Sequence, residues 1–228
     1  MSPDRQDYYR LVEHYERCLD RHGDTHRGVD WPNQEDASRR YDVMLDLVRP
    51  GTAGATLLDF GCGAGHLLEH MSRTGRKIAE YSGLDLGRRY VELCRRKFPD
   101  TDFLHVDILD TPSAVPEFDY VVLNGVLTEK RELSFEAMWD YTQRLLSVVF
   151  SKARIGMAFN VMSTQVDWQR DDLFHLPMDD VAAFLRRDVS RHFVIRHDYG
   201  LYEYCVYAYK APPPSDGGRG ADAVGHDA

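Results

Sequence analysis

The sequence predicts an α/β domain of the doubly wound type, built on a mostly parallel sheet. An apolar segment at 57–60 runs into a glycine-rich turn at 61–65 and then into residues with helical spacing. Apolar and amphipathic segments keep alternating up to residue 162, as expected for repeated strand–helix units. Near the end, 192–199 and 202–210 alternate as strands and meet at a tight Gly200 turn. We therefore expect a seven-stranded sheet whose last two strands form an antiparallel hairpin.

Two amphipathic helices are predicted ahead of the glycine-rich turn. Apolar side chains recur at helical spacing from Tyr8 to Leu19 and again from Tyr41 to Val48. The loop between them, 22–32, contains groups that can bind a ligand, and its length favours a functional role. We assign 1–50 to an N-terminal helical lid, 51–210 to the α/β domain, and 211–228, which is rich in proline, glycine and aspartate, to a disordered tail.

The glycine-rich turn has the composition of a cofactor-binding loop. Glycines there permit unusual backbone angles and let the main chain approach a ligand closely. Asp59 just before the turn can hold the turn's own amides or a cationic part of a ligand, and it disfavours phosphate. A dinucleotide-binding turn also requires a glycine or alanine where this chain has His66. The spacing therefore argues against a nicotinamide cofactor.

The same turn resembles motif I of the class I S-adenosylmethionine-dependent methyltransferases. The family's pattern of two apolar residues, an acid and three alternating glycines is matched by Asp59, Gly61, Gly63 and Gly65. The resemblance implies a Rossmann-like fold, S-adenosyl-L-methionine as the cofactor and methyl transfer as the reaction. It also implies that these four residues bind the cofactor.

Two later strand ends extend the resemblance. Asp85 follows the second predicted strand, where the family's acid accepts hydrogen bonds from the ribose hydroxyls. Asp107 and Ile108 follow the third, where the resemblance implies that Asp107 accepts from the adenine amino group and Ile108 covers a face of the ring. The expected cofactor site thus draws on the carboxyl ends of consecutive parallel strands.

The fourth predicted strand ends at Asn124, where the family often places groups near the methyl donor. We assign Asn124 both to cofactor binding and to orienting the acceptor. Enzymes that methylate nucleic-acid bases carry prolines where this chain has Gly125 and Val126, and the related aminopropyl transferases carry an acid where it has Asn124. Both of these activities are therefore disfavoured.

A hydroxyl or ammonium acceptor would benefit from a base, which typically contributes about 10²- to 10⁴-fold. His26, in the long loop, and His197, near the end of the chain, are the histidines that we predict as catalytic, together with Asn124. His175 is a further candidate base.

The composition limits the partners. The chain has 228 residues, with 37 acidic and 28 basic side chains and a net charge of -9, which disfavours nucleic acid. Its four cysteines are scattered, so we predict neither a metal site nor disulfides. No segment approaches the roughly 20 apolar residues that span a bilayer, so we expect a cytoplasmic protein without a membrane partner. The oligomeric state is left open.

A small-molecule acceptor is the leading prediction because the chain is short and acidic and shows no appended recognition domain. A protein acceptor is the first alternative. Cyclisation of S-adenosylmethionine itself and a non-catalytic cofactor-binding subunit are the others.

Overall fold

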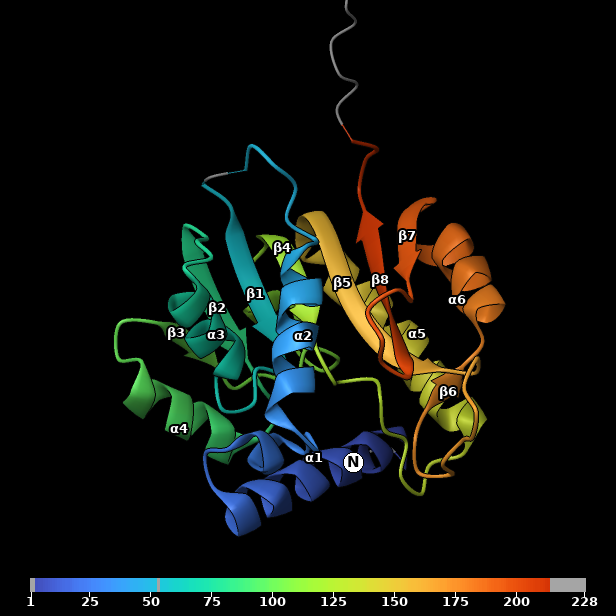
Figure 1. Cartoon of the computed structure of the whole chain (residues 1–228), viewed down its shortest axis with the longest axis horizontal. Helices are drawn as coiled ribbons and strands as arrows, with labels where there is room; N and C mark the ends of the chain where they lie inside the picture. Colours follow the sequence, from blue (N-terminus) through green and yellow to red (C-terminus); the bar gives the residue numbers. More distant parts are fainter. Residues whose placement is uncertain (1–2, 53, 214–228) are drawn as a thin grey trace, which may run out of the picture.

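The computed structural model describes residues 3–52 and 54–213, which fold around one mixed sheet (Figure 1). The strand order is β3-β2-β1-β4-β5-β8-β7, with β6 paired to the end of β5. The strands are β1 (Thr56–Phe60), β2 (Glu80–Leu84), β3 (Asp102–Leu104), β4 (Phe118–Leu123), β5 (Ala153–Ser163), β6 (His175–Leu176), β7 (His192–Arg196) and β8 (Glu203–Tyr209). Only β8 runs antiparallel to its two neighbours, which confirms the doubly wound, Rossmann-like sheet and its antiparallel C-terminal pair.

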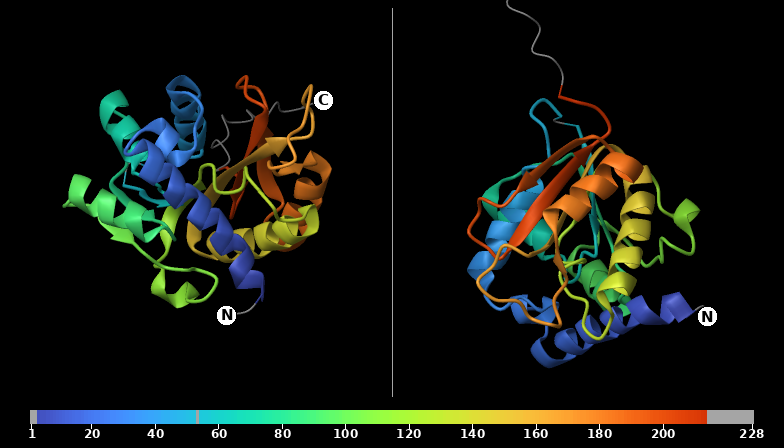
Figure 2. Two further views of the ribbon diagram at one scale, coloured as in Figure 1. Left: turned by 90° about the horizontal axis from the view of Figure 1, so that it is seen from below. Right: turned by 90° about the vertical axis from the view of Figure 1, so that its right-hand side faces the viewer.

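Helices cover both faces of the sheet (Figures 1 and 2). One face buries apolar side chains from α2 (Gln34–Leu45), α3 (His66–Thr74) and α4 (Arg88–Lys97). The other face buries those from α5 (Phe135–Ser151), α6 (Met178–Phe184) and the π-helical turn η3 (Leu185–Val189). A short 3₁₀ turn, η2 (Pro112–Ala114), precedes β4. Both faces of the central strands are therefore buried, which explains why those strands are almost continuously apolar.

The helix α1 (Pro3–His22) and the 3₁₀ turn η1 (His26–Val29) lie across the carboxyl ends of the parallel strands (Figure 1; Figure 2, left). Tyr90 of α4 holds this segment in place, because its hydroxyl lies 2.7 Å from the carbonyl of Tyr15 and 2.5 Å from that of Gly28. By contrast, α2 packs on the face of the sheet through Tyr41 and Met44. Of the segment predicted as a lid, α1 and η1 thus cover the strand ends.

The strand boundaries differ from the predicted ones in two places. The two-residue strand β6 is an addition to the seven predicted strands, since two residues are too few for an alternating pattern to show. The hairpin connection is also longer than the expected tight turn, because β7 ends at Arg196 and β8 begins at Glu203. Gly200, with φ +74°, lies within this connection.

Beyond β8, the carbonyls of Ala211 and Pro212 accept hydrogen bonds from the guanidinium of Arg49. The remainder of the predicted tail, 214–228, lies outside the described residues. Within the described part of the chain, no helix has the length and apolar character that crossing a bilayer requires.

Candidate functional site

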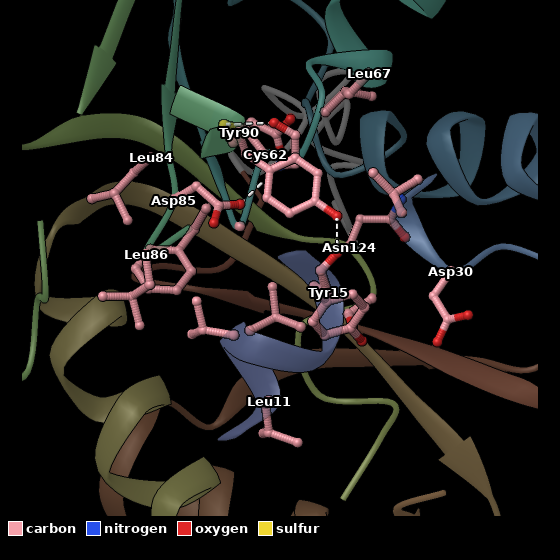
Figure 3. A pocket seen from close by; sticks show the side chains of 18 of the residues that line it. Leu11, Tyr15, Asp30, Cys62, Leu67, Leu84, Asp85, Leu86, Tyr90 and Asn124 are labelled. Atoms are coloured by element: carbon pink, nitrogen blue, oxygen red, sulfur yellow. Dashed lines mark hydrogen bonds between the residues drawn. The ribbon is translucent and has the colours of Figure 1, made fainter. Parts of the chain in front are cut away.

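A cavity of about 130 Å³ lies between the strand ends and the covering segment of α1 and η1 (Figure 3). Its wall contains the glycine turn after β1, the ends of β2 and β4, and side chains from α1, α2, α4 and the loop after η1. Aromatic rings line much of it, and three carboxylates reach it, those of Asp30, Asp59 and Asp85. No lysine or arginine of the described residues lines it, so the cavity is acidic and suits a cationic ligand.

The glycine turn is tied to the neighbouring strand. The amides of Gly61 and Cys62 donate to the carbonyl of Leu84, at 2.7 and 3.0 Å. Gly63 has φ +51°, and a Cβ added there would lie 2.9 Å from Cγ1 of Val29 on the covering segment. Both the backbone angle and the space therefore require glycine at this position.

Asp85 holds the turn from the end of β2. Its two carboxylate oxygens accept from the amides of Gly63, at 2.9 Å, and Gly87, at 2.7 Å. Burial raises the pKa of Asp85 to about 6, while these two amides act in the opposite direction. Each carboxylate oxygen can accept more than one hydrogen bond, so Asp85 can serve the turn and a ligand together.

Asp59 does not hold the amide of Gly63, which bonds to Asp85 instead. The side chain of Asp59 accepts from the hydroxyl of Tyr81 at 2.7 Å and is only 3% exposed. Burial raises its pKa to about 7, against the effect of the Tyr81 hydrogen bond. A cationic group in the cavity would favour the ionised carboxylate. This agrees with the prediction that Asp59 can hold a cationic part of a ligand.

The raised pKa of Asp59 predicts a pH-dependent stability. Because the folded-state pKa lies above the unfolded value, the native protein binds more protons between about pH 4 and 7, and stability falls as pH rises through that window. We expect Asp59→Asn to raise the free energy of unfolding at pH 8 by at least about 1 kcal/mol relative to wild type, with a smaller gain at pH 4. Urea unfolding at the two pH values measures this, and an equal effect at both would contradict it.

Asn124 lies at the end of β4 and lines the cavity. Its Oδ1 atom is buried and has no hydrogen-bond partner within the described part of the chain. A buried acceptor without a donor is costly, so this atom suits a donor group on a ligand. Asn124 is therefore well placed for the orienting role predicted for it.

Gly125, the next residue, is fixed by a buried polar network. Its amide donates to Asn160 Oδ1 at 2.8 Å, and Asn160 Nδ2 donates to Glu203 at 2.9 Å. Glu203 also accepts from Nε of Arg40, whose guanidinium lies 4.1 Å from the ring centroid of Trp31. The ring of Trp31 in turn occupies the space that a Cβ on Gly125 would need. The loop after η1 is thereby anchored to the end of β4.

Asp107 and Ile108 do not line the cavity. The carboxylate of Asp107 accepts from the hydroxyls of Tyr8 and Tyr9 on α1, at 2.8 and 3.1 Å, and Ile108 is buried in the core. The sequence places both at the third strand end, but the structure engages Asp107 with the covering helix. Their role toward adenine stays a prediction.

The predicted catalytic histidines also lie outside the cavity. His26 lines a separate polar groove of about 520 Å³ that shares Tyr41 and His66 with the cavity wall. His197 is exposed in the β7–β8 connection, with its ring edge-on to Tyr204. His175 is bonded through Nδ1 to the carbonyl of Ser163. Of the residues assigned to catalysis, the structure brings only Asn124 to the cavity.

Tyr15, Asp30 and Tyr90 are among the lining residues that the sequence does not identify as site residues. Asp30 lies in the loop expected to be functional, next to Trp31, but nothing distinguishes it there from the other polar residues. Tyr15 was assigned to the apolar stripe of its helix, and Tyr90 carries no motif. Only the folding of α1 over the strand ends brings them together.

The residues present fit S-adenosylmethionine. Gly61 and Gly63 line the cavity without side chains of their own, Asp85 retains acceptor capacity, and the acidic wall complements a sulfonium and an ammonium group. Val29 of the covering segment lies against Gly63.

Comparison with known proteins agrees with this site. A family model described as "Methyltransferase domain" matches residues 57–148. A curated protein of Mycobacterium tuberculosis named as a methyltransferase is 28% identical over 159 residues, which cover 67% of this chain and 92% of that protein. These matches support a class I S-adenosylmethionine-dependent methyltransferase, an enzyme that uses S-adenosylmethionine.

Solved structures share the fold at low identity. Magnesium protoporphyrin IX methyltransferase of Synechocystis PCC 6803, with bound S-adenosylmethionine, has a TM-score of 0.64 at 15% identity, covering 90% of this chain and 97% of its own. Human N-acetylserotonin methyltransferase, also in complex with S-adenosylmethionine, has a TM-score of 0.56 at 14% identity, covering 90% and 66%.

Proposed function

We propose that this enzyme transfers the methyl group of S-adenosylmethionine to a small molecule held in the cavity between Asn124 and the covering segment. The observation that carries the proposal is the enclosure of the cavity. The segment of α1 and η1 lies across the strand ends, and Trp31 packs on Gly125 beside Asn124. A compact acceptor fits under this cover, whereas a peptide or nucleic-acid strand would require the cover to open widely.

In this proposal the turn at Gly61 and Gly63 would hold the cofactor, Asp85 would accept hydrogen bonds from its ribose, and Asp59 and Asn124 would complement its cationic groups. When bound, S-adenosylmethionine supplies an electrophilic methyl group on a sulfonium. The protein then has to align the acceptor atom with that methyl and exclude water, and the aromatic wall of the cavity suits both tasks.

The charge of the protein supports a metabolite over nucleic acid. The net charge of -9 and the acidic cavity both repel polyanions. Two structural relatives are named for the methylation of small molecules, magnesium protoporphyrin IX and N-acetylserotonin. Their identities are low, so they support this assignment only as members of the same fold.

Methyl-labelled S-adenosylmethionine tests the proposal. The purified protein is incubated separately with a fractionated metabolite extract, with a protein extract and with nucleic acid, and the products are separated by size. Label in low-molecular-weight products together with S-adenosylhomocysteine is the expected result. Label only in protein or nucleic acid, or release of methylthioadenosine in place of S-adenosylhomocysteine, would contradict the proposal.

Trp31→Ala is expected to lower turnover, because the loop after η1 loses its anchor on Gly125 and Arg40 and the cover closes less firmly. We expect about a tenfold fall in the methylation rate with little change in S-adenosylhomocysteine affinity. Trp168→Ala is the matched control, since Trp168 is exposed and does not line the cavity. Equal rates for wild type and Trp31→Ala would exclude a role for this anchor.

A further inference from the structure

The cavity has a second acidic end, at Asp30, to which no part of the cofactor is assigned in the proposed function. Asp30, at the end of η1, has φ +61°, and its carboxylate lies 2.7 Å from Nε2 of His14 on α1. Glu129 Oε2 lies 3.7 Å from the same nitrogen and 3.1 Å from the guanidinium of Arg131. Three segments distant in sequence thus bring two carboxyl groups and a histidine to one place.

This cluster adjoins Asn124, away from Asp85. Figure 3 shows Asp85, Leu84 and Leu86 on one side of the cavity, with Asn124, Tyr15 and Asp30 on the other. If the ribose lies at Asp85, as the proposed function requires, the space at Asn124 and Asp30 falls to the acceptor.

The polar atoms at this end are hydrogen-bond acceptors. Asn124 Oδ1 is buried without a partner in the described part of the chain, and the Asp30 carboxylate lines the wall. The Gly125 carbonyl accepts from Tyr15 and Thr128, at 3.2 and 3.1 Å. The unpaired Asn124 Oδ1, together with the carboxylate of Asp30, fits a ligand group that carries several N–H bonds.

The charge state of the cluster also suits a cation. Burial would raise the pKa of Asp30, but hydrogen bonds from His14 and Glu129 lower it, so Asp30 is ionised at neutral pH. Burial, and next the charge of Asp30, raise the pKa of Glu129 to about 7, so Glu129 holds the proton of the pair. The other titratable groups nearby are Tyr15, Cys18, Tyr90 and Arg131.

We propose that the methyl acceptor of this enzyme is a small amine, bound as its ammonium ion by Asp30 and Asn124. The inference rests on the proposed function and names the class of its acceptor. One proton of the ammonium is released to water, which reaches this end of the cavity because the side chain of Asp30 is 33% exposed. The neutral nitrogen forms a bond to the methyl carbon while the carbon–sulfur bond breaks and its electron pair stays on sulfur. The products are a methylated ammonium ion and S-adenosylhomocysteine.

An anionic acceptor is disfavoured by the same wall. A carboxylate or phosphate would lie beside Asp30 with no lysine or arginine of the described residues lining the cavity to offset the repulsion. Acids are therefore expected to be poor substrates. A neutral alcohol carries no charge that could pair with Asp30.

Three probes of one shape and different charge test the inference: benzylamine, benzyl alcohol and benzoate. Their dissociation constants are measured by ligand-observed NMR on the protein saturated with S-adenosylhomocysteine. We expect benzylamine to bind about tenfold or more tightly than benzoate. This ratio of dissociation constants corresponds to the free energy of one charge-assisted hydrogen bond. In Asp30→Asn this preference should fall to about twofold or less, with S-adenosylhomocysteine affinity unchanged.

Cys18→Ser is the matched control, since Cys18 Sγ lies 3.7 Å from His14 Nε2 but does not line the cavity. It should keep the preference for benzylamine. Wild type dialysed against EDTA should keep it too, because EDTA removes any metal ion that the group of His14, Cys18 and Asp30 could hold. The inference is overturned if benzylamine does not bind, if benzoate binds as tightly, if Asp30→Asn keeps the preference, or if EDTA abolishes it and Zn²⁺ restores it.

These outcomes are separable from those of the proposed function. Methylation of metabolites that are all acids or alcohols would refute the amine while leaving a small-molecule methyltransferase intact. Label found only in protein would refute the small-molecule assignment, and the charge preference could still hold, because a lysine side chain carries the same ammonium group.

Discussion

Gly63→Leu is expected to abolish binding of S-adenosylmethionine and S-adenosylhomocysteine. Gly63 has a positive φ, and its amide is held by Asp85 at the centre of the glycine turn. A side chain there would occupy the space into which the ligand must fit, which now holds only Val29 of the covering segment. Isothermal titration calorimetry should detect no heat for either ligand under conditions that give a clear transition for wild type.

Gly75→Leu separates loss of space from backbone strain. Gly75 ends α3 with φ +70°, yet a Cβ there would meet nothing within 4 Å. Both variants should lose stability, by roughly 1 kcal/mol for a side chain forced into this region, but only Gly63→Leu should lose binding. Loss of binding in both, or tight binding of NAD with no response to either adenosyl ligand, would contradict the assignment of the turn.

Asp85→Ala is expected to weaken S-adenosylhomocysteine binding by about 1 to 3 kcal/mol, the range for hydrogen bonds to a charged group. The alanine variant also loses the acceptor for the amides of Gly63 and Gly87. Asp85→Asn keeps one oxygen acceptor and should lose less. An unchanged dissociation constant in Asp85→Ala would mean that Asp85 serves only the turn.

The pH dependence of binding gives a second measurement on Asp85. Its carboxyl has a pKa of about 6 and is ionised above that value. Affinity that depends on the ionised form should therefore rise as pH increases through 6 and become constant above it. In Asp85→Asn this rise should disappear, which distinguishes a ligand contact from a general effect of pH on the fold.

Part of the cofactor site could be predicted from the sequence because local pattern and strand direction determine it. The apolar run before Gly61 predicts a buried strand, and Asp59, Gly63 and Asp85 follow from the ends of two consecutive strands. Parallel strands that are neighbours place their carboxyl ends at the same edge of the sheet, so these residues meet in any fold with this topology. The hydrogen bond from the Gly63 amide to Asp85 is the observed result.

The end of the cavity that we propose for the acceptor could not be predicted in this way. Asp30, His14 and Glu129 come from η1, α1 and the segment after β4, and no periodicity links them. We predicted His26 and His197 as catalytic from their residue type alone. His26 lines the separate polar groove, and His197 is exposed in the β7–β8 connection. The sequence by itself determined the sheet, the glycine turn and the cofactor class, because these depend on short-range pattern. Only the tertiary structure decided which polar side chains line the cavity, because that depends on how α1 packs across the strand ends through long-range contacts such as those of Tyr90.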